Sequence, residues 1–292
     1  MKILVIGHSV VDHINDNIKP GGIYYSTTAL YNFKDKDDEI SLLTSLSDDS
    51  YYHFESLYSM IDIKNSQRVK EIPTVFLKIH KTKERDECYL SLTDKLIINS
   101  EIDFDEFDGI LINMITGFDI ELEDLKLIRS KFNGPIFFDV HTFSRGMDEN
   151  RKRKFRKIPN AGDWVSNIDI LQANETEIGT LSGENELNEI INELFNRGIK
   201  ILIITKGAEG ASIYFKENST IKRLDENALP VNSINNVGCG DIFGAVFFYS
   251  YIKSSNLING LKKANAAAGV STTYKSFEEY KNLKHDTDRF IN

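Results

Sequence analysis

The sequence predicts an α/β fold, a doubly wound and mostly parallel sheet with helices on both faces. Three observations lead to it. Short β-rich runs alternate with helical patterns along the chain. Most of these runs are unbroken apolar stretches, which is typical of strands buried on both faces of a parallel sheet. The chain of 292 residues is 41% hydrophobic, which is enough to fill a core around one sheet.

The predicted strands are short and mostly apolar. They are residues 2–7, 40–46, 109–113, 135–140, 169–174, 201–207 and 211–215. Two amphipathic helices stand out between them. Residues 119–132 stop at the Gly134-Pro135 pair, and residues 184–197 stop at Gly198, because glycine and proline end helices. Strands separated by helices predict parallel pairing.

One segment breaks this alternation. Residues 74–80 and 87–92 form two expected strands joined by the polar turn 81–86, which makes a hairpin. We expect one apolar set to share a face of it: Val75, Leu77, Ile79, Cys88, Leu90 and Leu92. The hairpin is either a small sheet over the mouth of the main sheet or an edge element that does not move. Its half-apolar surface also offers a dimer interface.

Charge and composition restrict the partners. A net charge of −9 and a pI near 5.3 argue against nucleic acid and anionic membranes, which need a positive surface. We interpret the basic run 151–157 as a solvated, self-repelling helix face. Cys88 and Cys239 are too few for a disulfide framework, and no signal peptide or membrane-length apolar run is visible. The sequence therefore predicts a cytoplasmic protein with a small-molecule partner.

The most informative motif is a glycine turn late in the chain. Gly238 and Gly240 flank Cys239 just before an apolar helix, so three successive backbone N–H groups can face an anion. The helix dipole favours negative charge there, and Asp241 can take a proton from a hydroxyl. Taken alone, the same four residues also fit an ordinary helix start with a capping aspartate. As a functional motif they predict phosphoryl transfer.

The residues around this turn carry a family resemblance. The heptapeptide Asn-Asn-Val-Gly-Cys-Gly-Asp at 235–241 resembles the Asp-Thr-x-Gly-Ala-Gly-Asp signature of the ribokinase-like (PfkB) carbohydrate kinases. Further motifs follow in the expected order, and the chain has no Walker sequence. The resemblance implies a single ribokinase-like α/β domain over residues 1–292. It also implies a β lid formed mainly by residues of about 70–98 and by the segment 12–22.

The resemblance implies an acceptor site. Asp12 looks like the aspartate after the family's first strand, whose ionised carboxylate accepts substrate hydroxyl protons. The Gly21-Gly22 pair resembles the motif that admits substrate close to the backbone. Asp139 and Arg145 resemble a pair found in several sugar and inositol kinases, although Asp139 also fits a strand-end aspartate capping a turn. The implied substrate-binding residues are Asp12, Gly21, Gly22, Ser26 (where relatives usually have Asn), Asp139 and Arg145.

The resemblance also implies a donor site for ATP. Asn174 and Glu177 resemble the family's Asn-x-x-Glu motif, which helps to hold Mg²⁺ through water. The turn 205–210 looks like the family's Thr-x-Gly-x-x-Gly, and the small-residue helix around 264–270 like the one bordering the adenine. The implied cofactor-binding residues are Asn174, Thr205, Gly207, Gly210, Asn265 and Gly269, with Glu177 on the metal. Asn235 replaces an aspartate associated with K⁺, an ion that its amide oxygen would hold more weakly.

These motifs imply an ATP-dependent kinase that phosphorylates a hydroxyl of a sugar or polyol such as an inositol. Asp241 would be the general base, and the amides of Gly238, Cys239 and Gly240 the anion hole. Two alternatives remain open. One is a nucleoside kinase of the same family, and the other is a non-catalytic ligand-binding relative. Retention of Asp241 argues against the second, because a pure binder needs no carboxylate beside an anion hole.

Overall fold

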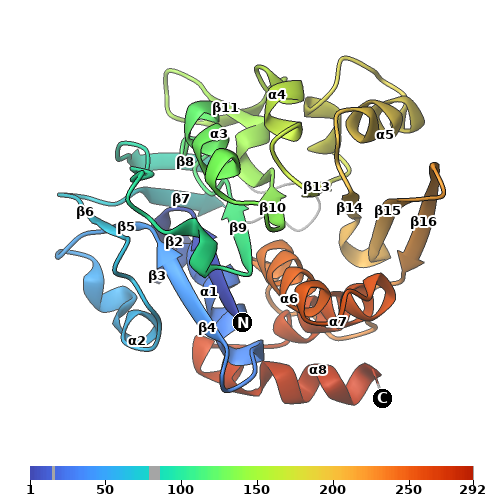
Figure 1. Cartoon of the computed structure of the whole chain (residues 1–292). Coiled ribbons are helices and arrows are strands. Elements are labelled where there is room, and N and C mark those ends of the chain that lie inside the picture. The colour runs from blue at the N-terminus through green and yellow to red at the C-terminus, as the bar shows by residue number, and fades with distance from the viewer. Residues whose placement is uncertain (15–16, 79–85, 292) are drawn as a thin grey trace.

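The computed structural model describes residues 1–14, 17–78 and 86–291. Its centre is an eight-stranded sheet (Figure 1). In spatial order the strands are β16 (Thr220–Glu226), β15 (Ala211–Glu217), β14 (Ile201–Thr205), β13 (Ile170–Asn174), β10 (Ile136–Asp139), β9 (Gly109–Asn113), β1 (Lys2–Ile6) and β4 (Glu39–Leu43). The strands from β14 to β4 are parallel, while β15 and β16 continue the sheet antiparallel. The predicted fold class is confirmed.

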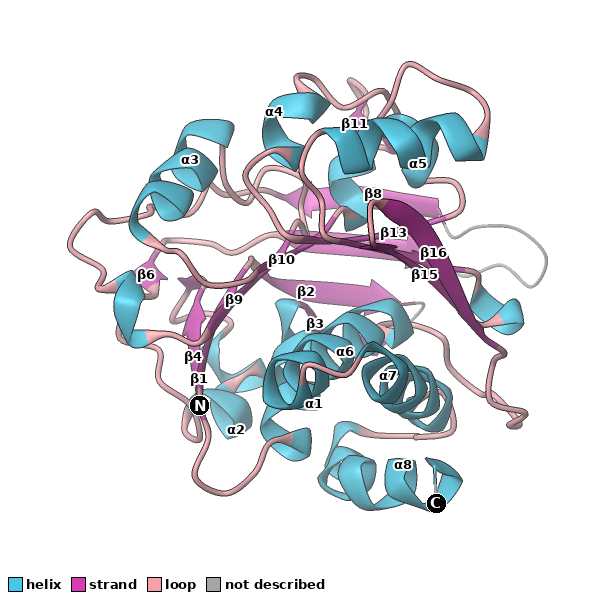
Figure 2. Cartoon of the chain, turned by 45° about the vertical axis from the view of Figure 1, so that its right-hand side comes forward, coloured by secondary structure: helices cyan, strands magenta, loops and turns pink. Residues whose placement is uncertain are grey.

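The central strands are buried on both faces. In β1, Ile3 and Val5 belong to one apolar core, and Leu4 and Ile6 to the other. Because successive side chains of a strand point to opposite faces, an unbroken apolar run requires helices on each side. Figure 2 shows these two helical layers.

Each face has its own group of helices. On one face lie α1 (Ile23–Phe33), α6 (Cys239–Ser254) and α7 (Leu257–Ser271), with α8 (Leu283–Ile291) packed on α7. On the other lie α3 (Leu122–Lys131), α4 (Ala161–Val165) and α5 (Leu187–Asn196). The remaining helical elements are short: α2 (Glu55–Tyr58), η1 (Tyr51–His53), η2 (Phe104–Glu106), η3 (His141–Ser144), η4 (Ile178–Thr180), η5 (Gly207–Glu209) and η6 (Phe277–Asn282). Within the described residues, no helix combines the length and the apolar character needed to cross a bilayer.

The two predicted amphipathic helices are present but begin later than predicted. The helix expected from residue 119 starts at Leu122, because the buried Asp119 carboxylate instead accepts the backbone N–H groups of His8 and Thr116 at 2.9 and 2.8 Å. This carboxylate fixes the loop after β9 to the loop after β1. It therefore helps to shape the sheet edge on which the candidate site lies.

A four-stranded sheet, which we call the lid sheet, lies beside the main sheet. Its order is β3 (Asn17–Gly22), β2 (Ser9–Ile14), β7 (Thr74–Lys78) and β8 (Asp86–Ser91). The pairs β3–β2 and β7–β8 are antiparallel, and β2–β7 is parallel. Residues 79–85, which include Ile79 and most of the expected turn, lie outside the described residues.

The predicted inward face of β8 was wrong. The register pairs Val75 with Tyr89, after an irregularity between Thr74 and Val75. As a result Glu87 and Tyr89 are buried, whereas Leu90 is 50% exposed. Glu87 and Tyr89 can be buried here because charged side chains contact them, as described below. Apolar alternation therefore did not identify the inward face.

The interpretation of residues 151–157 as a helix face was also wrong. Part of this run is β12 (Arg153–Phe155), which pairs with β11 (Arg145–Met147) in a small antiparallel sheet. Extended backbone separates neighbouring basic side chains onto opposite faces, which relieves their repulsion. A further two-stranded sheet pairs β5 (Ser45–Leu46) with β6 (Gln67–Arg68).

Candidate active site

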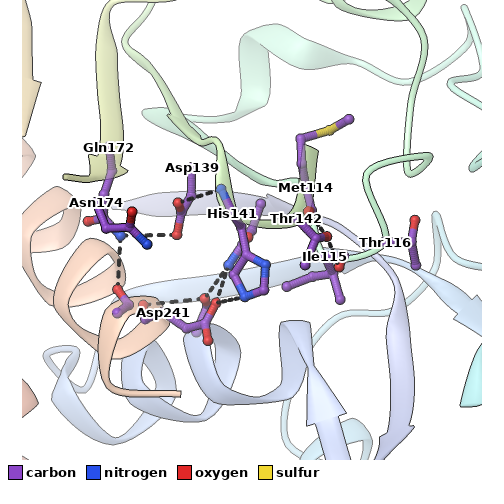
Figure 3. A network of polar contacts seen from close by, with 12 residues as sticks. Met114, Ile115, Thr116, Asp139, His141, Thr142, Gln172, Asn174 and Asp241 are labelled. Carbon is purple, nitrogen blue, oxygen red and sulfur yellow. Dashed lines mark hydrogen bonds and ion pairs between the residues drawn. The ribbon is translucent and has the colours of Figure 1, made fainter. Parts of the chain in front are cut away.

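Polar side chains end four neighbouring parallel strands of the main sheet. β9, β10, β13 and β14 are adjacent, and their last residues are Asn113, Asp139, Asn174 and Thr205. In a parallel sheet the carboxyl ends of the strands lie at one edge, which is where open α/β sheets bind ligands. Helix α6 begins at this edge, so the glycine turn faces these strand ends (Figure 3).

The glycine turn opens a helix, as predicted. Gly238 is the N-cap of α6 with φ 83°, a conformation that only glycine adopts readily. A Cβ atom on Gly238 would also lie 2.2 Å from Cδ1 of Tyr25, so the ring packs directly on the turn. At Gly240 a Cβ atom would meet nothing within 4 Å. The first turn of α6 therefore has open space beside Gly240, where an anion can reach the helix N-terminus.

Asp241 lies in the first turn of α6 and is buried. Its Oδ1 accepts a hydrogen bond of 2.6 Å from Nδ2 of Asn113 and lies 3.8 Å from Nε2 of His141. Figure 3 shows the His141 ring pointing to this carboxylate. The Ser26 hydroxyl donates to the backbone oxygen of Asp241 at 3.3 Å, so Ser26 helps to hold the first turn of α6 in place. These contacts hold the carboxylate in one orientation.

Asp139 lies beside Asp241 at the end of β10. Nε2 of Gln172 donates to its Oδ2 at 3.0 Å, and the N–H of His141 donates to its Oδ1 at 3.2 Å. Burial, followed by the charges of Asp241 and Glu177, raises the pKa of Asp139 well above its usual value. The carboxylates of Asp241 and Glu177 thus add to the effect of burial on the pKa of Asp139, and the three side chains gather negative charge at this point. A bound cation would offset that charge.

The Asn-x-x-Glu motif forms a compact turn after β13. Oδ1 of Asn174 accepts the N–H of Glu177 at 2.9 Å, and Oε2 of Glu177 accepts the N–H of Asn174 at 2.9 Å. Among the described residues, no three His, Cys, Asp or Glu side chains come together in a way that holds a metal alone. This donor set suits Mg²⁺, which usually binds one or two carboxylates and completes its shell with water and phosphate oxygens.

A cavity of about 40 Å³ lies between the lid sheet and the start of α6. Residues from both sheets line it: Val10, Asp12, Gly22, Tyr25, Val75, Leu77, Glu87, Tyr89, Ile115, His141, Thr142, Val237, Gly238 and Asp241. The structure thus brings Asp12, on the lid sheet, and Asp241, on α6, to one space. Gly21 lies directly against Asp12, because a Cβ atom there would sit 2.0 Å from Oδ2 of the carboxylate.

Other predicted substrate residues lie outside the wall of this cavity. Asp139 faces Gln172 at the strand ends, and Ser26 lies beneath Asp241. Nη1 of Arg145 lies 3.5 Å from Oε1 of Glu87, whose side chain is buried, while that of Arg145 is partly exposed. Arg145 is therefore connected to the cavity by Glu87, a residue of the lid sheet that lines it.

The predicted cofactor residues lie at the ends of β13 and β14, in the turn after β14 and on α7. Gly207 follows β14, and a Cβ atom there would meet nothing, whereas one on Gly210 would lie 2.0 Å from the oxygen of Glu226. On α7, Nδ2 of Asn265 donates to the oxygen of Asn227 at 2.6 Å. A Cβ atom on Gly269 would lie 2.7 Å from Cβ of Leu229. The loop between β16 and α6 is thus packed closely on α7.

Asn235 has its amide oxygen turned into its own loop. Its Oδ1 accepts the N–H of Val237 at 3.1 Å, and its N–H donates to the oxygen of Thr272 at 3.1 Å. The backbone of 234–235 is therefore tied to the loop after α7.

Sequence reasoning missed several residues of the site. Asn113 and Gln172 sit at or near the ends of apolar strands, where a lone amide is the available signal. His141 adopts φ 38°, and nothing in its local sequence indicates that left-handed conformation. Glu87 and Tyr89 were placed on the wrong face of β8. Each of these contacts depends on a partner far away in the sequence.

Comparison with known proteins gives a consistent result. Residues 149–281 match the model of the pfkB family of carbohydrate kinases. A ribokinase of Arabidopsis thaliana is 25% identical over 162 residues, which are 53% of this chain and 38% of that protein. The matches span 38% to 42% of the length of the first three curated relatives, all ribokinases.

Similar solved structures extend over almost the whole chain. A ribokinase from Thermotoga maritima aligns with a TM-score of 0.76 at 19% identity, covering 99% of this chain and 98% of that one. A pyrophosphate-dependent kinase of the ribokinase family, solved with a pyrophosphate analogue and myo-inositol, aligns with a TM-score of 0.73 at 16% identity, covering 93% and 94%. At these identities the structural matches establish the fold.

Proposed function

This chain belongs to the ribokinase-like (PfkB) carbohydrate kinase family, and on that premise we propose that it transfers the γ-phosphoryl group of ATP to a hydroxyl of a sugar or an inositol-like polyol. One observation carries the proposal. The Asp241 carboxylate lines a cavity that also contains Asp12, and it does so in the first turn of a helix whose N-terminus is open beside Gly240. The residues proposed as base, as acceptor-binding carboxylate and as anion site therefore lie close together.

Asp241 is the proposed general base. The 2.6 Å hydrogen bond from Asn113 stabilises the ionised carboxylate and orients it towards the cavity. An acceptor hydroxyl bound there gives its proton to Asp241 as its oxygen attacks phosphorus, and the bond from phosphorus to the ADP oxygen breaks. Asp12 holds the acceptor by accepting its other hydroxyls. Positioning supplies most of the rate in such a reaction.

The glycine turn is the proposed anion hole. The N–H groups of Gly238, Cys239 and Gly240 and the dipole of α6 would stabilise charge on the transferring group. Gln172 fixes the geometry of this turn, since its Nε2 donates both to the oxygen of Gly240 at 3.0 Å and to Asp139.

Asp139 and Glu177 are the residues that would hold Mg²⁺, Glu177 through water. Burial is the main cause of the raised pKa of Asp139, and the charges of Asp241 and Glu177 add to it. A divalent cation would offset these charges, which supports the assignment. When bound, the ion supplies charge neutralisation for the phosphate oxygens. We further propose that Asn174, Thr205, Gly207, Gly210, Asn265 and Gly269 contact the nucleotide.

Activation by K⁺ is a separate proposal, which rests on Asn235. An amide oxygen is a weaker ligand than a carboxylate, and this one already accepts a backbone N–H. We therefore expect at most a weak response. Exchanging KCl for choline chloride at constant ionic strength should change kcat by less than about 3-fold, and a large loss would assign a stronger site to this loop.

The proposed acceptor class rests on the relatives. The curated proteins that this chain matches include ribokinases and deoxyribokinases, so we propose a sugar or polyol acceptor ahead of a nucleoside. Ser26 and Arg145 would act on this acceptor indirectly, through Asp241 and Glu87 respectively. Gly21 and Gly22 would let the acceptor and Asp12 lie close to the backbone.

Two proposals concern the protein as a whole. The outward face of the lid sheet exposes Ile18, Phe76 and Leu90 by 54%, 40% and 50%, which suits a homodimer through this sheet. Light scattering of Phe76→Lys against wild type tests it, and a monomer in both cases would contradict it. We also propose a cytoplasmic location, which the low number of cysteines fits, since two are too few for a disulfide framework.

The proposed function is tested by an acceptor screen. Purified protein is incubated with Mg²⁺, ATP and a panel of pentoses, hexoses, inositols and nucleosides, and ADP release is followed by a coupled assay. A parallel series replaces ATP by pyrophosphate and follows phosphate. Turnover with a sugar or inositol supports the proposal, and preference for a nucleoside supports the alternative kinase. Binding of acceptor without turnover on either donor would identify a non-catalytic binder.

A further inference from the structure

Arg153 lies in β12, within the basic run 151–157, and its guanidinium turns inward. Nη1 donates to the hydroxyl of Tyr89 and to the oxygen of Thr116, the latter at 2.6 Å. Nη2 donates to the oxygen of Thr142 and, at 3.4 Å, to the oxygen of Arg145. One side chain thus joins the lid strand β8 to the loops that follow β9 and β10.

Three of these four contacts adjoin the acceptor cavity, those with Tyr89, Thr116 and Thr142. Tyr89 and Thr142 line it, as do Ile115 and His141, the neighbours of Thr116 and Thr142 in the chain. The guanidinium carbon also lies 5.0 Å from the centre of the Tyr89 ring, which adds a cation–π contact. The position of Arg153 is therefore linked to three walls of the cavity.

The guanidinium of Arg153 fits between these loops because a glycine lies next to it. Gly117 has φ 76°, and a Cβ atom there would lie 2.8 Å from the oxygen of Thr142 and 3.2 Å from Nη2 of Arg153. A larger residue would separate the two loops that Arg153 bridges. The glycine and the arginine thus form one arrangement.

The main chain beside Arg153 strengthens the connection to the lid. The N–H of Tyr89 donates to the oxygen of Arg151 at 3.1 Å, and Nη1 of Arg151 donates to the oxygen of Leu90 at 3.0 Å. Burial raises the pKa of Tyr89, although the charge of Arg153 opposes this, so the phenol keeps its proton. It can then accept from Arg153 and donate to the oxygen of Thr116 at 3.3 Å.

We propose that Arg153 is a positioning residue for the acceptor. It fixes β8 against the loops after β9 and β10 before any ligand binds, and it thereby sets the width of the cavity in which the acceptor hydroxyl meets Asp241. This inference rests on the proposed function for its kinetic consequence, but its structural part stands on the contacts of Arg153 alone. Lysine cannot replace these contacts fully, because it has one nitrogen where arginine has a planar fork of donors.

The test compares Arg153→Gln and Arg153→Lys with Lys154→Gln. Lys154 is a suitable control because it is the next residue of β12, carries the same charge, and has a 73% exposed side chain. Hydrogen exchange is first measured without ligand. We expect the amides of β8 to exchange about 10- to 100-fold faster in Arg153→Gln, as expected for the loss of charge-assisted hydrogen bonds, while β14 stays unchanged.

Steady-state kinetics then separate positioning from general stability. In Arg153→Gln the KM for the acceptor should rise about 10-fold or more, with kcat falling less and the KM for the donor staying within about 2-fold. Arg153→Lys should recover part of the loss, and Lys154→Gln should match wild type. Tyr89→Phe should reproduce a smaller version of the same change, and it serves in place of Arg153→Gln if that variant does not fold.

Unchanged exchange in β8 and an unchanged acceptor KM would overturn the proposal. So would equal losses for acceptor and donor, which indicate general destabilisation. If wild type turns over no acceptor, the proposed function has failed, while the exchange data still decide whether Arg153 fixes β8.

Discussion

Replacing Gly240 by alanine should separate stability from activity. Gly240 is the second residue of α6, and a Cβ atom there would meet nothing within 4 Å. Glycine within a helix is less stable than alanine by roughly 0.5–1 kcal/mol, so Gly240→Ala should raise the free energy of unfolding by up to this amount. For a chain of this length the melting temperature should rise by roughly 1–3 °C.

Activity should change in the opposite direction. The new methyl group fills the space through which an anion reaches the N-terminus of α6. Alanine keeps the backbone N–H of position 240, so the loss comes from the methyl group, which holds the phosphate away from a donor. Losing one donor of an anion hole costs about 10²-fold in kcat, and we expect a loss of up to that order in Gly240→Ala. The assays are a thermal melt and coupled ADP release, on the same preparation.

Gly238→Ala is the matched comparison. At φ 83°, and with a Cβ atom 2.2 Å from the Tyr25 ring, alanine at position 238 should cost about 1–3 kcal/mol of stability. The two variants thus differ in the sign of their stability change while both lose activity. If Gly240→Ala kept wild-type kcat and donor KM, the anion would not approach this turn, and our reasoning about the open space would be refuted.

Two further predictions concern buried carboxylates. Asp12→Ala should lower kcat/KM for the acceptor by about 10²-fold, because Asp12 lines the cavity, while the nucleotide Kd hardly changes. An equal loss of ATP affinity would place Asp12 outside the acceptor site. Asp139 has a folded-state pKa above its unfolded value of about 3.9, so its contribution to stability is fully present below that value and is lost as pH rises through the folded pKa. Without Mg²⁺ or nucleotide, urea midpoints at about pH 5 and pH 8 should therefore show Asp139→Asn gaining on wild type as pH rises, and parallel pH dependences would argue against the raised pKa.

The main sheet was predictable because its signal is local. An apolar run such as 201–205 is buried on both faces, which is typical of a central strand of a sheet that helices cover on both sides. The glycine turn was predictable for the same reason, since two glycines and Asp241 occupy consecutive positions at the start of an apolar helix.

The lid and its contacts were less predictable. Tyr89 and Glu87 are buried because Arg153 and Arg145 reach them from 64 and 58 residues away. Apolar alternation reads only the strand itself, and so it assigned Leu90 to the inner face. The inward turn of Arg153 depends likewise on carbonyl groups of two loops, which no local pattern within 151–157 reveals.

Asp241→Asn tests the central claim most directly. Asparagine keeps the shape of the side chain and an oxygen that can accept from Nδ2 of Asn113, so the fold and ATP binding should persist. It cannot take the acceptor proton. Phosphotransfer measured by ADP release should fall by about 10²–10⁴-fold with the nucleotide Kd unchanged. A variant that folds, binds ATP and retains wild-type kcat would contradict the assignment of Asp241 as the general base.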